Sequence, residues 1–157
     1  AKVRAMSEHR PDTDFVLIAR TDARSVDGLE AAVERAAAYR EAGADMIFPE
    51  GLQSEEEFGR FAEACPGPLL ANMTEFGKTP DITAARFSDL GYDIVIHPLS
   101  MMRLAMGHVV RGLEVLREHG TVAPVLGEMQ TRAELYDLLG YEPGRQWDFP
   151  GTPGGAG

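Results

Sequence analysis

The sequence predicts an α/β protein in which parallel strands alternate with helices and a functional site lies at the carboxyl ends of the strands. Four short uncharged, mainly apolar runs, at 15–19, 46–48, 69–71 and 94–96, are each followed at once by polar residues. A segment with helical spacing of its apolar residues then follows each run. Such runs are typical of strands buried on both faces, and their alternation with helices is typical of parallel β/α folds.

The segments between the runs carry the start and stop signals of helices. Residues 1–9 are predicted to be the end of a helix, and the helix that follows 25–28 is predicted to stop at Gly43. Ser54 and Glu57 have the spacing of a capping box and predict the next helix start. Further helix starts are expected at Asp81 or Thr83, at Ser100, and at Thr131 with Glu134.

The composition restricts the class of protein. The chain has 157 residues, 44% of them hydrophobic, which suits one unit with a sizeable core. The formal net charge of -10 argues against nucleic acid as a partner. No apolar run of about 18 residues is present, so no membrane span is predicted, and no signal peptide opens the chain. Cys65 is the only cysteine, which favours a reducing, cytoplasmic location.

Polar residues that follow the strands are the candidates for a functional site. They are Arg20, Asp22, Glu50, Asn72, Thr74, His97 and Arg103. In a barrel of parallel strands such residues point into one mouth. Arginines in an acidic chain suit a ligand with carboxylates or a phosphate, because guanidinium binds such groups bidentately. Asn72 and Thr74 lie two residues apart, so they share a face of an extended strand and offer neutral donors.

The same residues also have structural interpretations. Arg20 is compatible with a surface ion pair, Glu50 with an anion near a helix start, and His97 before a proline favours a structural role. The methionines at 101, 102 and 106 are predicted to belong to a core or an interface. No zinc-type spacing of cysteine and histidine, no glycine-rich phosphate loop and no Gly-x-Ser-x-Gly elbow occurs in the sequence.

Five strings, in this order and spacing, carry a resemblance to a known family. They are FVLIARTDA, GADMIFPEG, LLANMTEFGKTP, HPLSMMR and MQTRAELYDLLGY. Together they resemble the isocitrate lyase/phosphoenolpyruvate mutase superfamily, and within it the 2-methylisocitrate lyases. The match runs from about Phe15 to Tyr141. The isocitrate lyases proper differ after the position of Asn72, where they carry a Ser-Pro-Ser type segment.

This resemblance implies a (β/α)8 barrel and a magnesium-dependent cleavage of 2-methylisocitrate to pyruvate and succinate. It implies that Mg²⁺ polarises the pyruvyl half of the substrate and stabilises an enolate as the bond breaks. Arg20 is then expected to bind the pyruvyl carboxylate, with Glu50 beside it. The remaining substrate contacts are expected from Asn72 and Thr74 to the succinyl carboxylate, from Arg103 as a clamp on the same half, and from Arg132 as a further positive group.

The resemblance covers only the later part of the family's pattern. A closed barrel needs eight units and about 250 residues, whereas this chain shows four units and begins without methionine inside a helical pattern. We therefore expect residues 1–141 to supply the last four units of a barrel and a C-terminal helix, and 142–157 to be a disordered tail. The family's magnesium ligands and catalytic cysteine loop are expected upstream, so no catalytic or metal-binding residue is assigned in this chain.

The resemblance also implies an assembly. The family exchanges C-terminal helices between subunits, and the helix that starts at Thr131 is the candidate, although it is also compatible with packing on its own barrel. We expect a homotetramer of helix-swapped dimers, and we expect the isolated chain to be inactive and poorly folded because half a barrel exposes sheet edges. Two alternatives remain open: a phosphonomutase or oxaloacetate-type decarboxylase of the same superfamily, and a non-catalytic anion-binding module.

Overall fold

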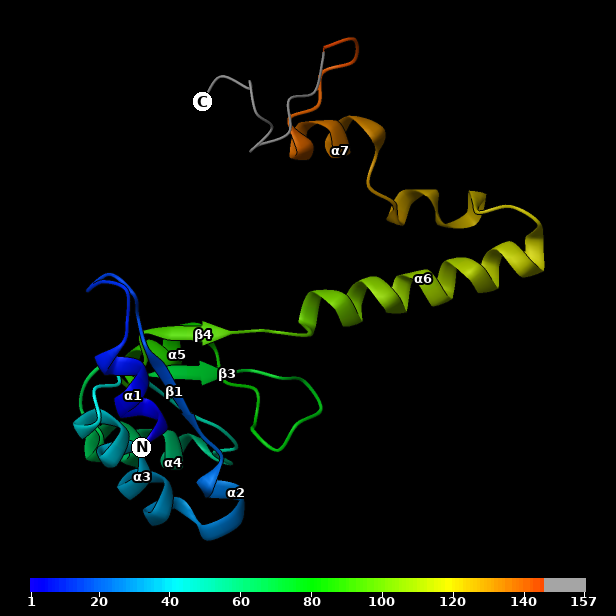
Figure 1. Ribbon diagram of the computed structural model, residues 1–157. Helices are drawn as coiled ribbons and strands as arrows, with labels where there is room; N and C mark the ends of the chain where they lie inside the picture. The colour runs from blue at the N-terminus through cyan, green and yellow to red at the C-terminus, as the bar shows by residue number, and fades with distance from the viewer. Residues whose placement is uncertain (146–157) are drawn as a thin grey trace. The chain divides into compact units, whose positions relative to one another are not determined.

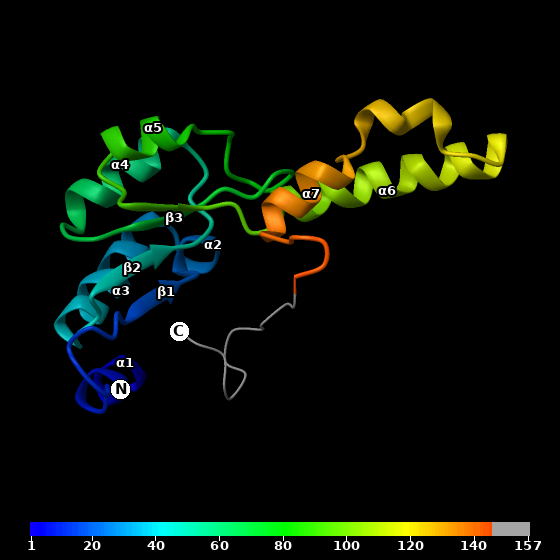
Figure 2. The same cartoon turned by 90° about the horizontal axis from the view of Figure 1, so that it is seen from above.

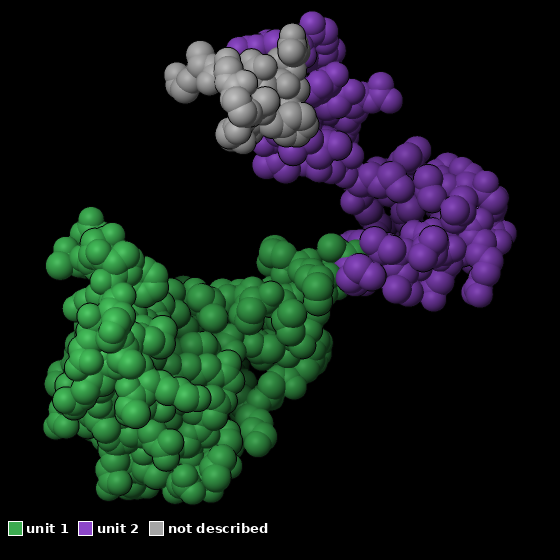
Figure 3. All heavy atoms as spheres, in the orientation of Figure 1, with its two compact units in different colours: residues 1–105 green, residues 106–157 purple. Residues whose placement is uncertain are grey.

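The computed structural model describes residues 1–145. It divides into two units, residues 1–105 and residues 106–157, which Figure 3 colours separately and which are described here one at a time. The tail predicted at 142–157 lies, from residue 146 onward, outside the described residues.

Four parallel strands in chain order form the centre of the first unit. They are β1 (Ile18–Thr21), β2 (Met46–Pro49), β3 (Leu70–Asn72) and β4 (Ile94–Ile96). β1 pairs with β2 and β3 pairs with β4, both in parallel, and a parallel bridge between Ile47 and Leu69 joins the two pairs. Figure 2 shows β1, β2 and β3 running alongside one another.

Each strand is followed by at least one helix, as Figure 1 shows. Helix α1 (Lys2–Glu8) precedes β1; α2 (Ala23–Asp27) and α3 (Leu29–Glu41) follow it; α4 (Glu55–Ala64) follows β2; α5 (Ala84–Asp89) follows β3; and α6 (Ser100–His119) follows β4. The alternation expected from the sequence is therefore present. The short helix α2 was not expected, because five residues are too few to show a helical period.

The predicted helix starts differ in detail from those observed. Thr83 rather than Asp81 caps α5, since its side chain accepts a hydrogen bond from Arg86 N. Ser54 caps α4 as predicted, but the capping box is only half formed, because the Glu57 carboxylate accepts from Gln53 N and not from Ser54 N. Ser100 was expected to cap α6 but is its first helical residue, and its hydroxyl donates to Glu75 instead.

The core of the first unit lies between the strands and the helices that follow them. Its fully buried side chains include Ile47, Leu52, Phe61, Leu69 and Phe87. The rings of Phe58, Phe87 and Tyr92 pack edge to face, with centroids 4.9 to 5.6 Å apart, which joins α4 to α5 and to the start of β4.

Two aspartates fix the amino-terminal ends of neighbouring strands in the same way. Asp45, just before β2, accepts a hydrogen bond from Leu17 N, just before β1, at 2.8 Å. Asp93, just before β4, accepts from Leu69 N, just before β3, at 2.9 Å. Each carboxylate pairs a backbone donor that the strand ladder leaves free. Both follow a glycine by two residues, so the device recurs in the sequence as Gly-x-Asp.

The second unit contains most of α6, a 3-10 helix (η1, Ala123–Glu128) and α7 (Arg132–Leu139). Arg111 of α6 donates to Glu128 at 2.7 Å, which ties η1 to α6. The capping box predicted at Thr131 and Glu134 is complete, and α7 ends at Gly140, whose φ of 61° is left-handed. Within the described part of the chain, no helix combines the length and apolarity that a membrane crossing requires.

Candidate functional site

Four of the predicted site residues lie at the carboxyl ends of three neighbouring strands. Arg20 is near the end of β1, Glu50 directly follows β2, Asn72 ends β3 and Thr74 lies two residues beyond it. Glu50 N donates to the carbonyl of Thr21 at 2.9 Å, so the backbone itself fixes Glu50 beside the end of β1. The parallel order of the strands therefore brings these residues to one edge.

Their side chains form a continuous row of polar contacts. Arg20 NH1 lies 3.5 Å from Glu50 Oε2, and Asn72 Nδ2 donates to the same oxygen at 3.2 Å. Thr74 Oγ1 donates to Asn72 Oδ1 at 3.0 Å. We call Arg20, Glu50, Asn72 and Thr74 the strand-end row. Every member of this row was a candidate from the sequence.

The alternation of side chains in β1 explains how Arg20 reaches the row. Ala19 and Thr21 are buried, and Arg20 between them points to the other face, with 51% of its side chain exposed. Its guanidinium lies 5.1 Å from the ring centroid of Phe48, its partner in β2. The sequence predicted Arg20 just after the strand, but it lies inside β1, because the ladder continues to Thr21 and Pro49.

Asp22, a candidate from the sequence to which no role was assigned, pairs with Arg20. Arg20 donates from Nε to Asp22 Oδ2 at 3.0 Å and from NH2 to Oδ1 at 2.7 Å, so one edge of the guanidinium is already occupied. This pairing lowers the pKa of Asp22 and raises that of Arg20. The Arg-x-Asp spacing of the string ARTDA was the signal for this pair. Asp22 and Glu50 together place two carboxylates against one guanidinium.

Arg103 is held by a different group. It lies in the first turn of α6 and donates from NH1 to the carbonyl of Glu75 at 2.6 Å and to its Oε2 at 3.3 Å. Its guanidinium also lies 5.5 Å from the ring centroid of Phe76. Among residues 1–145, Arg103 hydrogen-bonds to no member of the strand-end row. Glu75 was missed by sequence reasoning, since its partners lie 25 and 28 positions further along the chain.

Two other candidates lie elsewhere in the chain. Arg132 is the first residue of α7 in the second unit. His97 follows β4 and is exposed. Met101, Met102 and Met106, which the sequence assigned to a core or an interface, are 69%, 57% and 54% exposed, so they belong to no core formed by residues 1–145.

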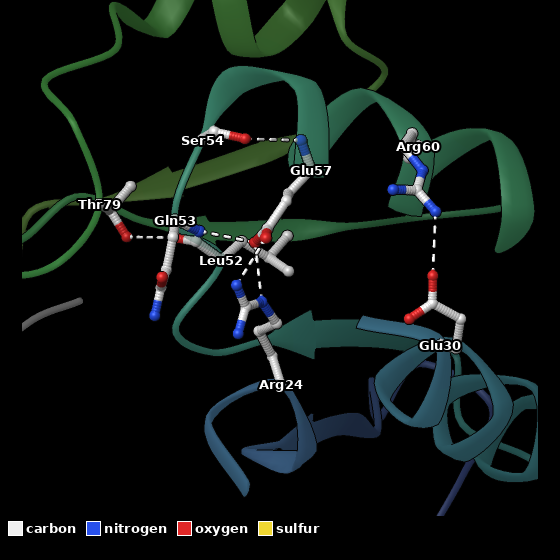
Figure 4. Close-up of polar contacts among 8 residues, drawn as sticks. All are labelled: Arg24, Glu30, Leu52, Gln53, Ser54, Glu57, Arg60 and Thr79. Atoms are coloured by element: carbon white, nitrogen blue, oxygen red, sulfur yellow. Dashed lines mark hydrogen bonds and ion pairs between the residues drawn. The ribbon is translucent and has the colours of Figure 1, made fainter. Parts of the chain in front are cut away.

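Two side-chain contacts connect the segments that follow β1, β2 and β3, and Figure 4 shows both of them. Arg24 of α2 donates to both carboxylate oxygens of Glu57 in α4, at 2.9 and 2.6 Å, and both side chains are about four-fifths buried. Thr79 donates to the carbonyl of Leu52 at 2.6 Å. The first contact joins the helices that follow β1 and β2, and the second joins the loops that follow β2 and β3.

The described residues do not by themselves suit a divalent metal. No cluster of three or more histidine, cysteine, aspartate or glutamate side chains fit to hold an ion occurs among residues 1–145. Glu50 of the row and the neighbouring Asp22 are both paired with Arg20. The row instead offers an arginine, an amide and a hydroxyl, which are groups that bind carboxylates.

The fold and the row define an α/β protein with a candidate anion-binding site at the carboxyl ends of parallel strands. Residues 1–117 match the phosphoenolpyruvate phosphomutase family. The chain therefore belongs to this family.

Similar proteins agree with this assignment. The 2-methylisocitrate lyase of Bacillus subtilis (strain 168) is 50% identical over 140 residues, which are 89% of this chain and 46% of that protein. A crystal structure of 2,3-dimethylmalate lyase has a TM-score of 0.77 at 36% identity and covers 87% of this chain and 49% of that one. Phosphonopyruvate hydrolase in complex with oxalate and Mg²⁺ has a TM-score of 0.74 at 32% identity, with 88% and 50% covered. The chain spans about half the length of the curated relatives it matches.

Proposed function

We propose that this chain forms the strand-end part of the substrate site in a lyase that cleaves 2-methylisocitrate to pyruvate and succinate. The observation that carries the proposal is the strand-end row. In this row Arg20 contacts Glu50, Glu50 contacts Asn72, and Asn72 contacts Thr74. The 50% identity with the 2-methylisocitrate lyase of Bacillus subtilis supports this substrate, because 2-methylisocitrate is the substrate that this relative's name gives.

In the proposed reaction the row binds the two halves of the substrate. Arg20 and Glu50 would hold the pyruvyl half, and Asn72 and Thr74 a carboxylate of the succinyl half. The substrate hydroxyl passes its proton to a base that is expected from the rest of the enzyme. Its oxygen becomes the ketone of pyruvate, and the electron pair of the broken C–C bond passes to the succinyl carbon. The adjacent carboxylate then takes up negative charge, which Arg103 and the neutral donors stabilise. A proton delivered to that carbon completes succinate, and no described residue is assigned to deliver it.

We also propose a magnesium requirement, with metal ligands from outside this chain. The complex of phosphonopyruvate hydrolase with oxalate and Mg²⁺ supports the ion as a cofactor of this family. The described residues lack a cluster that fits a metal, so this chain's own part in the reaction is to bind the carboxylates of the substrate. Removal of Mg²⁺ with EDTA is expected to abolish turnover, and readdition is expected to restore it.

We propose further that the four strands are the last four of a (β/α)8 barrel. The outer strands support this, since Ile18 of β1 and Ile94 of β4 are 42% and 40% exposed although they belong to apolar strands. Neighbouring strands would cover them. The exposed leucines of α7, Leu135, Leu138 and Leu139, support an exchange of this helix between subunits of a homotetramer. A monomeric mass by light scattering of the assembled enzyme would contradict the exchange.

The test uses a hybrid lyase, in which this chain replaces the 140 residues that it matches in the Bacillus subtilis relative. We expect Mg²⁺-dependent release of pyruvate from 2-methylisocitrate, and little from isocitrate, oxaloacetate or phosphonopyruvate. The parent enzyme is the positive control. A folded hybrid that prefers oxaloacetate or phosphonopyruvate would support the decarboxylase or mutase alternative and overturn the proposal. A folded hybrid that turns over none of the four substrates would also overturn it and would support an anion-binding module.

A further inference from the structure

The hydrogen bonds of Arg103 all pass through one nitrogen. Among residues 1–145, NH1 donates to both the carbonyl and the carboxylate of Glu75, and Nε and NH2 have no protein partner. The opposite holds at Arg20, where Nε and NH2 are both taken by Asp22. A guanidinium binds a carboxylate best through two nitrogens on one edge. Arg103 is therefore the arginine of the first unit's site that keeps the Nε–NH2 edge available.

Glu75 is itself anchored. Its second carboxylate oxygen accepts a hydrogen bond from the hydroxyl of Ser100, which is 7% exposed at the start of α6. The hydrogen bond from Ser100 contributes most to lowering the pKa of Glu75, and the backbone hydrogen bond of Glu75 and the pairing with Arg103 lower it further. Ser100 and Arg103 lie on adjacent turns of α6, so one carboxylate joins the loop after β3 to the helix after β4.

The backbone of the same loop supports the arrangement. Phe76 has a φ of 62°, a left-handed conformation that is unfavourable for an aromatic residue. The turn is closed by Gly77 N donating to the carbonyl of Thr74 at 3.3 Å. The strained backbone places the Phe76 ring beside the Arg103 guanidinium. Arg103 is thus bordered by a carbonyl, a carboxylate and a ring, all from residues 75 and 76.

We propose that Glu75 is a positioning residue, which holds Arg103 through NH1 so that its Nε–NH2 edge is available to the succinyl carboxylate of the substrate. The inference deepens the proposed function and rests on it. Glu75 does not touch the substrate in this proposal and acts only through Arg103.

The test measures affinity for succinate and for pyruvate separately, by calorimetry on the hybrid lyase. Glu75→Ala is expected to weaken succinate binding about tenfold, the loss typical of one charge-assisted hydrogen bond, and to raise KM more than it lowers kcat. Pyruvate affinity is expected to stay unchanged. Glu75→Gln, which can still accept from Ser100, is expected to lose less. Glu55→Gln is the matched control, since Glu55 pairs with Arg86 at similar exposure away from the row.

A double-mutant cycle separates positioning from a general effect on the loop. In an Arg103→Ala background, Glu75→Ala is expected to cause no further loss of succinate affinity. An equal loss in both backgrounds, or unchanged or tighter succinate binding in the single variant, would overturn the proposal. This test can fail while the proposed function holds, and the reverse is also possible. A hybrid that binds succinate but does not cleave 2-methylisocitrate still shows whether Glu75 positions Arg103.

Discussion

At the scale of single residues, the two arginines of the first unit's site differ in what already occupies them. Asp22 takes the Nε–NH2 edge of Arg20, and NH1 faces Glu50. Arg20 is thus fixed from two sides before any ligand arrives, and such preorganisation reduces the cost of ordering on binding. A lysine in its place has one ammonium and cannot reproduce this geometry.

The first prediction concerns Arg20→Lys in the hybrid lyase. We expect kcat/KM for 2-methylisocitrate to fall about 10- to 100-fold, because the planar fork between Asp22 and Glu50 is lost. Steady-state kinetics measure the effect. Arg86→Lys, on an exposed pair in α5, is the matched control and is expected to stay near the unmodified enzyme. An Arg20→Lys enzyme within twofold of the unmodified one would remove Arg20 from the site.

At the scale of elements, the pair of Arg24 and Glu57 connects α2 to α4, the helices that follow β1 and β2. The pair of Arg24 and Glu57 is better shielded from solvent than the other ion pairs of the described residues, with side chains 21% and 19% exposed. The neighbouring pair of Arg60 and Glu30 is 56% and 78% exposed. Exposed pairs contribute little, whereas a shielded bidentate pair contributes more and leaves an uncompensated charge when one partner is removed.

The second prediction is that Glu57→Gln lowers the free energy of unfolding at pH 7 by about 1 to 3 kcal/mol. Glu30→Gln, in the exposed pair with Arg60, is expected to leave it nearly unchanged. Urea unfolding of the hybrid lyase followed by circular dichroism measures both. Equal effects of the two variants would show that the shielding of the pair is unimportant.

The third prediction is a pH dependence from the same pair. The hydrogen bonds from Arg24 lower the pKa of Glu57 in the folded state. The stability that this shift contributes is present above the unfolded pKa of about 4.3 and is lost as the pH falls through the lower folded pKa. We therefore expect the difference between the unmodified protein and Glu57→Gln to shrink from pH 7 towards pH 3. A difference that stays constant over this range would contradict a charged Glu57.

The fourth prediction tests the aspartate contacts at the strand starts. Asp93→Ala removes the acceptor of Leu69 N, and Leu69 is only 1% exposed. We expect a loss of about 1 to 3 kcal/mol in unfolding free energy, typical of an unpaired buried donor. Asp89→Ala in the exposed last turn of α5 is the control and is expected to be nearly neutral. If both substitutions cost the same in chemical denaturation, the backbone contact has no special role.

At the scale of the whole molecule, the sequence predicted the strands and the row because both are local signals. An apolar run followed by a polar residue marks a strand end, and parallel order brings those ends together. Contacts between distant segments left no such signal. The pairing of Glu75 with Ser100 and Arg103 depends on how the loop after β3 meets α6. The end of β1 was misplaced because pairing with β2, rather than apolarity, decides where a strand stops.

The exposed apolar surface also belongs to this scale. Ile18 and Ile94 at the outer strands and the methionines of α6 are exposed in this chain. Apolar patterning indicates which residues are to be buried, but not whether their cover comes from the same chain or another one. The sequence therefore predicted the methionines to be in a core or an interface and did not distinguish between the two.

The central claim is that the strand-end row binds the carboxylates of the substrate. The most direct measurement is a crystal structure of the hybrid lyase with Mg²⁺, pyruvate and succinate bound. We predict carboxylate oxygens within hydrogen-bond distance of Arg20 on the pyruvate side and of Asn72 and Thr74 on the succinate side. Ligands bound elsewhere, with the row keeping only the internal contacts described above, would contradict the claim.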